Sequence, residues 1–205
     1  MNFRATERAQ RYLASLAKTP NYAIDATVGN GHDTLFLAEL VGNEGKVWGF
    51  DVQEEAIENA AALLKEKGLQ DRVELVHADH ASLLDHLPVE EVQNKVDCIM
   101  FNLGYRPGSD KQIITQPETT LQALEASHSL LAPDGCLTII VYTGHEGGEA
   151  EEEKIKEWLD QLPVQKWEVI RPPARIGSNS PPQLYIVTCV DRSPLTPEKP
   201  APWNL

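Results

Sequence analysis

The residues best suited to chemistry begin in a glycine-rich segment at 25–34, which reads DATVGNGHDT. Gly29 and Gly31 permit a tight turn and a close approach of the backbone to a ligand. Asp25 precedes them, and a carboxylate there suits a ligand with an ammonium group better than one with a pyrophosphate. The dinucleotide fingerprint G-x-G-x-x-G would need glycine at 34, where Thr34 stands, and the triphosphate signature G-K-[ST] does not occur.

Further carboxylates follow two later apolar segments of strand length. Asp51 ends one of them and can accept both hydroxyls of a ribose, a feature that NAD enzymes share. Asp79 follows the next and can accept the amino group of an adenine, with His80 lining the same pocket. The alternatives are a strand-end turn for Asp51, a helix N-cap for Asp79 and satisfied histidines for His77 and His80. No cysteine or third histidine lies close to this pair in the sequence, so we expect no metal site.

A second loop, 102–111, reads NLGYRPGSDK and follows a mostly apolar segment of strand length, VDCIMF. Asn102 and Tyr105 have the spacing of the N-P-P-Y motif of amino-group methyltransferases. An asparagine oxygen and a backbone carbonyl can hold the N–H groups of an attacking amine and orient its lone pair, and an aromatic ring can stack on a base. The alternative is a Gly/Pro loop in which Asn102 caps the strand end.

An attacking amine must be unprotonated, and Asp110, His80 or a water molecule could take its proton. Lys111 and Arg106 could hold a phosphate of the substrate or be ordinary surface charges.

Composition limits the classes of partner. The 205 residues include 18 basic and 31 acidic side chains, a net charge of −13, so non-specific binding along a nucleic-acid backbone is excluded unless a local patch supplies it. Candidates for such a patch are Arg4, Arg8, Arg11, Lys18, Arg171 and Arg175. Three widely spaced cysteines indicate reduced thiols and a cytoplasmic protein. No apolar run is long enough for a membrane span, and the charged first residues do not resemble a secretion signal.

Strand-length apolar runs alternate with helical patterns, which predicts a mostly parallel sheet with helices on both faces. Residues 1–190 are expected to form one domain, beginning with a helix within 1–20, and 191–205 a proline-rich tail. The expected strands are 22–26, 46–51, 72–77, 95–102, 136–142, 164–171 and 183–190. The expected helices are 4–18, 33–40, 54–67, 80–87, 117–131 and 149–161, with Pro133-Asp134-Gly135 ending the fifth. The last two strands lack an intervening helix and should pair antiparallel.

This seven-stranded α/β layout with a C-terminal antiparallel hairpin resembles the Rossmann-like class I methyltransferases. The strings DATVGNGHDT, FDVQ, NLGYRPGSDK and a late NSPP further resemble the MnmM (YtqB) family of tRNA methyltransferases, once labelled rRNA methylases, over about 23–182. The resemblance implies methyl transfer from S-adenosyl-L-methionine to the aminomethyl nitrogen of 5-aminomethyl-2-thiouridine at the tRNA wobble position. It also implies a homodimer that binds the tRNA anticodon region.

Carried over by position, the resemblance implies a cofactor site and an acceptor site. Cofactor contacts would come from Asn30, His32, Asp51, Gln53, Asp79 and His80, beside the glycine turn with Asp25, Gly29 and Gly31. Asn102 and Tyr105 would lie on the acceptor side, where Arg106 and Ser109 depart from the family's pattern.

Three other functions fit the same segments. An rRNA or a small-molecule amine methyltransferase would use the same cofactor site. A nucleoside-binding module without catalysis would not need Asn102 and Tyr105, and an NAD-dependent oxidoreductase would need the missing third glycine.

Overall fold

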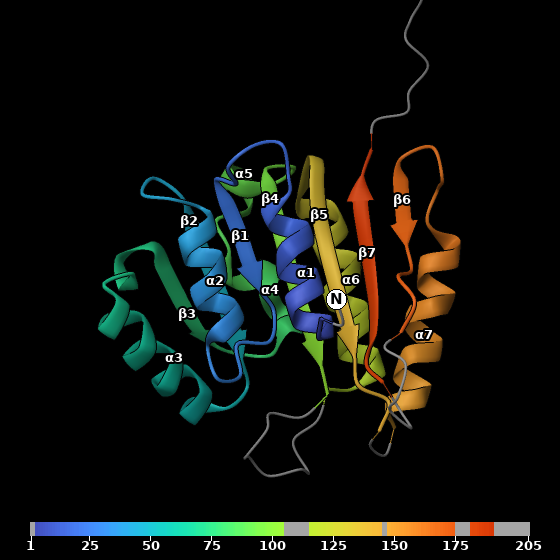
Figure 1. Ribbon diagram of the computed structural model, residues 1–205, viewed down its shortest axis with the longest axis horizontal. Coiled ribbons are helices and arrows are strands. Elements are labelled where there is room, and N and C mark those ends of the chain that lie inside the picture. The colour runs from blue at the N-terminus through green and yellow to red at the C-terminus, as the bar shows by residue number, and fades with distance from the viewer. Residues whose placement is uncertain (1–2, 105–114, 145–146, 175–180, 191–205) are drawn as a thin grey trace, which may run out of the picture.

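A seven-stranded sheet in the order β3-β2-β1-β4-β5-β7-β6 runs through the computed structural model, which describes residues 3–104, 115–144, 147–174 and 181–190 (Figure 1). The five strands β1 to β5 run parallel, and β7 is antiparallel to both β5 and β6. The predicted fold class is therefore confirmed. The strands are β1 (Tyr22–Asp25), β2 (Lys46–Asp51), β3 (Val73–His77), β4 (Val96–Leu103), β5 (Leu131–Val141), β6 (Trp167–Ile170) and β7 (Gln183–Cys189).

Helices cover both faces of the sheet (Figure 1). On one face, α1 (Ala5–Ala14) packs on β5 and β7, α2 (His32–Leu40) packs on β1 and β2, and α3 (Glu54–Lys67) packs on β2 and β3. On the other face, α6 (Pro117–Leu130) and α7 (Gly148–Gln161) pack on β5 and on each other. Shorter turns of helix are η1 (Gln70–Arg72), η2 (His80–Ser82), α4 (Leu83–His86) and α5 (Val89–Val92).

Successive side chains of the central strands point to opposite faces of the sheet, and they contribute to an apolar core on each face. In β4, Ile99 and Phe101 point into the core beneath α6 and α7, whereas Cys98 and Met100 point into the core beneath α1 and α2. All four side chains are at most 2% exposed, as expected for a central parallel strand with both faces covered.

The boundaries of α3 follow from local chemistry. Glu54 and Glu55 occupy its first turn and Lys65 and Lys67 its last, which complements the helix dipole. Gly68 ends it with a φ of 69°, a left-handed conformation that glycine adopts without cost. The predicted range of this helix matches the observed one.

The start of β5 differs from the prediction. Pro133-Asp134-Gly135 does not separate a helix from a strand, because the strand already begins at Leu131, which pairs with Val96. The register then shifts before Cys98 pairs with Cys136, and Asp134 takes a φ of 63°. The turn residues thus form an irregularity within the strand, which the buried Leu131 anchors.

Two further outcomes concern segments outside the main elements. The single helical turn α5 lies at 89–92, where no element was predicted. The predicted tail, 191–205, lies outside the described residues. Within the described stretches, no helix combines the length and apolar character needed to cross a membrane.

Candidate functional site

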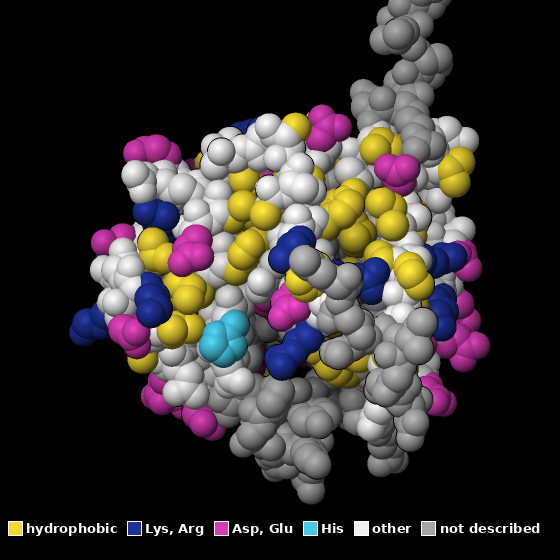
Figure 2. All heavy atoms as spheres, in the orientation of Figure 1, with side chains coloured by type: hydrophobic (Ala, Val, Ile, Leu, Met, Phe, Trp, Pro, Cys, Tyr) yellow, Lys and Arg dark blue, Asp and Glu magenta, His cyan; other side chains and the backbone are white. Residues whose placement is uncertain are grey.

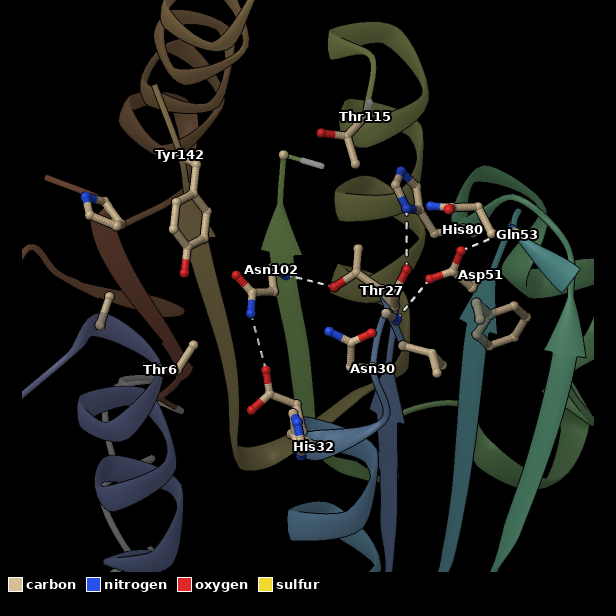
Figure 3. A pocket seen from close by; sticks show the side chains of 18 of the residues that line it. Thr6, Thr27, Asn30, His32, Asp51, Gln53, His80, Asn102, Thr115 and Tyr142 are labelled. Carbon is tan, nitrogen blue, oxygen red and sulfur yellow. Dashed lines mark hydrogen bonds between the residues drawn. The ribbon is translucent and has the colours of Figure 1, made fainter. Parts of the chain in front are cut away.

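A cavity of about 630 Å³ opens at the carboxyl ends of β1, β2 and β4, the edge where open α/β sheets bind ligands (Figure 3). Its size falls within the range of small-molecule sites. The turn after β1, the end of β2, η2, the end of β4 and helix α1 all contribute to its wall.

The end of β2 presents a carboxylate that the backbone holds in place. Gly29 N–H donates to Asp51 Oδ2 at 2.8 Å, and Gln53 N–H donates to Asp51 Oδ1 at 2.9 Å (Figure 3). All three residues line the cavity, together with Asn30 and His32. Each carboxylate oxygen keeps a further lone pair, so Asp51 can still accept two hydroxyl groups from a ligand.

The structure places Asp25 differently from our expectation of a ligand contact. Its side chain is 1% exposed, lies beneath the turn and is absent from the cavity wall. Asp25 accepts a hydrogen bond from Thr34 Oγ1 at 2.6 Å and another from Thr27 N–H at 3.1 Å. Burial, reinforced by the charge of nearby Asp33, raises the pKa of Asp25 to about 7. Asp25 therefore supports the turn from below.

Gly31 also differs from the expected role. It does not line the cavity, and it starts α2 with a φ of 77°. A Cβ atom there would lie 2.9 Å from Ala60 of α3. Glycine is thus required by the close approach of α2 and α3, whereas Gly29 lies on the cavity wall itself.

Asp79 and His80 both line the cavity. Asp79 accepts a hydrogen bond from Ala81 N–H at 2.8 Å, so it is also the N-cap that we considered as its alternative. His80 is 7% exposed, with Nδ1 at 3.3 Å from the Ala26 carbonyl oxygen and its ring edge-on to Phe101. Burial lowers the pKa of His80, which favours the neutral ring. Its Nε2 has no hydrogen-bond partner among the described residues.

Asn102 lies at the centre of the wall, next to the end of β1 (Figure 3). Its backbone N–H donates to Thr27 Oγ1 at 2.7 Å, and its Nδ2 donates to Asp33 Oδ2 at 3.3 Å. Its Oδ1 is buried and has no partner within the described part of the chain. A buried amide oxygen without a donor is costly unless a ligand supplies one.

The acceptor side combines predicted and unpredicted residues. Tyr105, Arg106, Ser109, Asp110 and Lys111 lie outside the described residues.

Tyr142, which the sequence analysis did not select, follows β5 and faces the cavity beside Asn102 (Figure 3). The signal for it was its position as the last residue of a predicted strand, 136–142. Gln10, Asp33 and Thr27 were also missed, although Asp33 and Thr27 belong to the segment that drew attention.

The predicted basic patch divides into separate groups. Arg4, the N-cap residue of α1, and Arg8, within α1, line the cavity, and Arg11 stacks on Phe3 with 3.7 Å between its guanidinium carbon and the ring centroid. Figure 2 shows Lys and Arg side chains near the middle of the face that α1 and α2 cover. In contrast, Lys18 pairs with the buried Asp97 at 2.7 Å, and Arg171 pairs with Asp160. Arg175 lies outside the described residues.

Across the described ranges, no three His, Cys, Asp or Glu side chains cluster as a metal ion would require. Cys98, Cys136 and Cys189 are buried free thiols.

Comparison with known proteins gives one matching family model and several similar structures. The model described as "Putative rRNA methylase" matches residues 47–188. A crystal structure of a "putative rRNA-methylase" from Clostridium thermocellum is 36% identical, with a TM-score of 0.86 over 93% of this chain and 100% of that one. A "putative methyltransferase" from Streptococcus mutans in complex with SAH is 30% identical, with a TM-score of 0.80 over the same shares of the two chains.

A curated relative from Arabidopsis thaliana carries a specific name. It is the chloroplastic tRNA (mnm(5)s(2)U34)-methyltransferase, 37% identical over 172 residues, which are 80% of this chain. The chain spans 62% of that relative's length.

Proposed function

The chain belongs to the rRNA methylase family, as the sequence resemblance predicted, and from that premise we propose that it is an S-adenosylmethionine-dependent methyltransferase acting on tRNA. The acceptor we propose is the aminomethyl nitrogen of 5-aminomethyl-2-thiouridine at the wobble position. The name of the Arabidopsis relative supports this choice of nucleoside. The observation that carries the proposal is the buried, unpartnered Oδ1 of Asn102 in the cavity wall.

The residues of the cavity fit the cofactor. When bound, S-adenosylmethionine supplies an electrophilic methyl group, and its sulfur keeps the electrons of the broken C–S bond as S-adenosylhomocysteine forms. Asp51 is held by two N–H groups with lone pairs left for a ribose diol, and Asp79 can accept from an adenine amino group. Asn30, His32 and the Gly29 backbone line the adjoining wall, where the rest of the cofactor would be held.

Asn102 orients the amine that receives the methyl group. Its Oδ1 accepts one N–H of a neutral amine, which leaves the nitrogen lone pair free to form the new N–C bond. The product nitrogen then loses one proton. His80 can accept it, because its neutral ring leaves Nε2 without a hydrogen bond among the described residues and 3.9 Å from the Asp79 carboxylate, and solvent can do so as well.

An RNA substrate accounts for features that a small amine would not need. Arg4 and Arg8 line the cavity of a chain whose net charge is −13, so two cationic side chains adjoin the site and could contact a phosphate, although Arg8 also donates to the Pro173 carbonyl oxygen at 2.8 Å. Tyr142 offers an exposed aromatic face, 38% accessible, on which a base can stack beside Asn102.

Nucleoside analysis tests the proposal. tRNA from a strain that lacks this gene is incubated with the protein and S-adenosylmethionine, digested and examined by mass spectrometry. We expect 5-aminomethyl-2-thiouridine to be converted to its methylaminomethyl form. Unchanged tRNA, with methyl incorporation into rRNA or a small amine instead, would contradict the tRNA assignment.

Cofactor choice is tested separately by calorimetry, in which S-adenosylhomocysteine should bind in the micromolar range and NAD should not. We also propose a homodimer and a cytoplasmic location from the family resemblance. Sedimentation and cell fractionation test these two points.

A further inference from the structure

Asp33 is a buried carboxylate at the junction of three elements. It lies in the first turn of α2, lines the cavity and is 7% exposed. Its Oδ2 accepts from Asn102 Nδ2 of β4 at 3.3 Å, and its Oδ1 accepts from Gln10 Nε2 of α1 at 2.7 Å. The methyl transfer proposed above assigns no step to this side chain.

The hydrogen bond between Asp33 and Asn102 fixes the orientation of the Asn102 amide. The oxygen and nitrogen of an asparagine side chain occupy nearly equivalent positions, so its neighbours decide which one faces a ligand. An ionised carboxylate only accepts hydrogen bonds, so Asp33 draws the NH₂ group toward itself. The Oδ1 atom must then face the other way, and it is this atom that is buried without a partner among the described residues.

We infer that Asp33 is a positioning residue, which holds the Asn102 oxygen toward the acceptor nitrogen. The inference rests on the proposed function, because it gives that oxygen an amine to bind. Gln10 secures the second oxygen of Asp33 from α1 and thereby limits rotation of the carboxylate. Burial raises the pKa of Asp33, and both hydrogen bonds oppose that rise by favouring the ionised, accepting form.

The isosteric variant Asp33→Asn separates orientation from packing. If Gln10 still donates to the remaining oxygen at position 33, the new NH₂ group faces Asn102. The Asn102 amide must then turn its oxygen toward position 33 and its NH₂ group into the cavity. We expect kcat to fall at least about tenfold, while KM for tRNA and Kd for S-adenosylhomocysteine stay within about threefold. Asp71→Asn, an equivalent change on the exposed η1, should leave all three unchanged.

Exchanging the two residues provides a rescue. In the double variant Asp33→Asn/Asn102→Asp, the amide at position 33 donates to one carboxylate oxygen and leaves the other facing the cavity. The single variant Asn102→Asp instead places two carboxylates in contact. We expect the double variant to turn over at least about fivefold faster than either single variant. Wild-type kcat in Asp33→Asn, or a double variant no faster than both single ones, would overturn the inference.

A measurement without turnover distinguishes the two proposals. In the NMR spectrum of the free wild-type protein, one Nδ2 proton of Asn102 should exchange slowly because it is bound to Asp33, and Asp33→Asn should abolish this protection. Fast exchange in the wild type would overturn the Asp33 role. Absence of wild-type activity on any tRNA would instead contradict the proposed function. If Asp33→Asn does not fold, kcat of the double variant is compared with kcat of Asn102→Asp alone. A double variant that is no faster than Asn102→Asp would then overturn the inference.

Discussion

Asp51 and Asn102 contact the cavity from β2 and β4, the two strands that flank β1, and their replacements should have different effects. Asp51→Ala removes the acceptor proposed for the ribose, so Kd for S-adenosylhomocysteine should rise by about tenfold or more. Asn102→Ala should abolish turnover and change that Kd little. Calorimetry and single-turnover assays of the two variants check this. An Asn102→Ala protein that methylates tRNA but no longer binds S-adenosylhomocysteine would contradict the roles proposed here.

Asp25 should make stability depend on pH. Its pKa is about 7 in the folded chain against 3.8 for the free side chain, chiefly because of burial. Between about pH 4 and 7 the folded state therefore keeps a proton that the unfolded state has lost, so the free energy of unfolding falls as pH rises. Asp25→Asn removes this titration, and urea unfolding at pH 5, 6 and 7 should show a flatter dependence. Identical slopes in the two proteins would refute this prediction.

Sequence reasoning reached some of the cavity residues and missed others for a physical reason. Asp51 and Asn102 follow directly from strand ends, because parallel strands bring their carboxyl ends to one edge. Asp33 was passed over because its significance depends on Gln10, which lies 23 positions away and is brought to it only by the packing of α1. Asp25 was assigned to the ligand because the sequence does not reveal that Thr34 folds back to bond it.

At the scale of elements, the spacing of α2 and α3 depends on Gly31. Gly31 and Gly68 both have left-handed φ angles, 77° and 69°, but a Cβ atom at 68 meets nothing within 4 Å and one at 31 meets Ala60. Gly68→Ala should cost only the backbone strain, about 1–2 kcal/mol. Gly31→Ala should lower the free energy of unfolding further, because α2 must also move away from α3. Chemical denaturation of both variants measures the difference, and equal losses would show that the close approach to Ala60 does not matter.

Regular elements were predictable where the local signals agree. The apolar run of β2 predicts a strand, and the apolar pattern of α3 agrees with the Gly68 that ends the helix. The start of β5 was not predictable, because a Pro-Asp-Gly turn signal usually ends an element. Here the preceding Leu131 and Ala132 are buried, so the chain pairs with β4 before the irregularity. The outcome depends on a tertiary pairing that local residue preferences do not contain.

At the scale of the whole molecule, RNA affinity should depend on few cations. Arg4→Gln/Arg8→Gln should raise KM for tRNA and reduce the slope of log KM against log salt concentration by about 1 for each phosphate that the protein no longer neutralises. Lys65→Gln, at the far end of α3, serves as a control and should change neither quantity. A double variant with the wild-type salt dependence would place the RNA on another surface.

The position of α1 has a consequence for synthesis on the ribosome. This helix is made before β5 and β7, the strands on which it packs, with Tyr12 Oη at 3.4 Å from Thr188 Oγ1. The surface on which α1 packs is therefore complete only after residues 183–189 have left the exit tunnel. A nascent chain can assemble the nucleoside end of its cavity before then, but α1, which carries Gln10 to Asp33, has its full packing surface only when β7 is inserted.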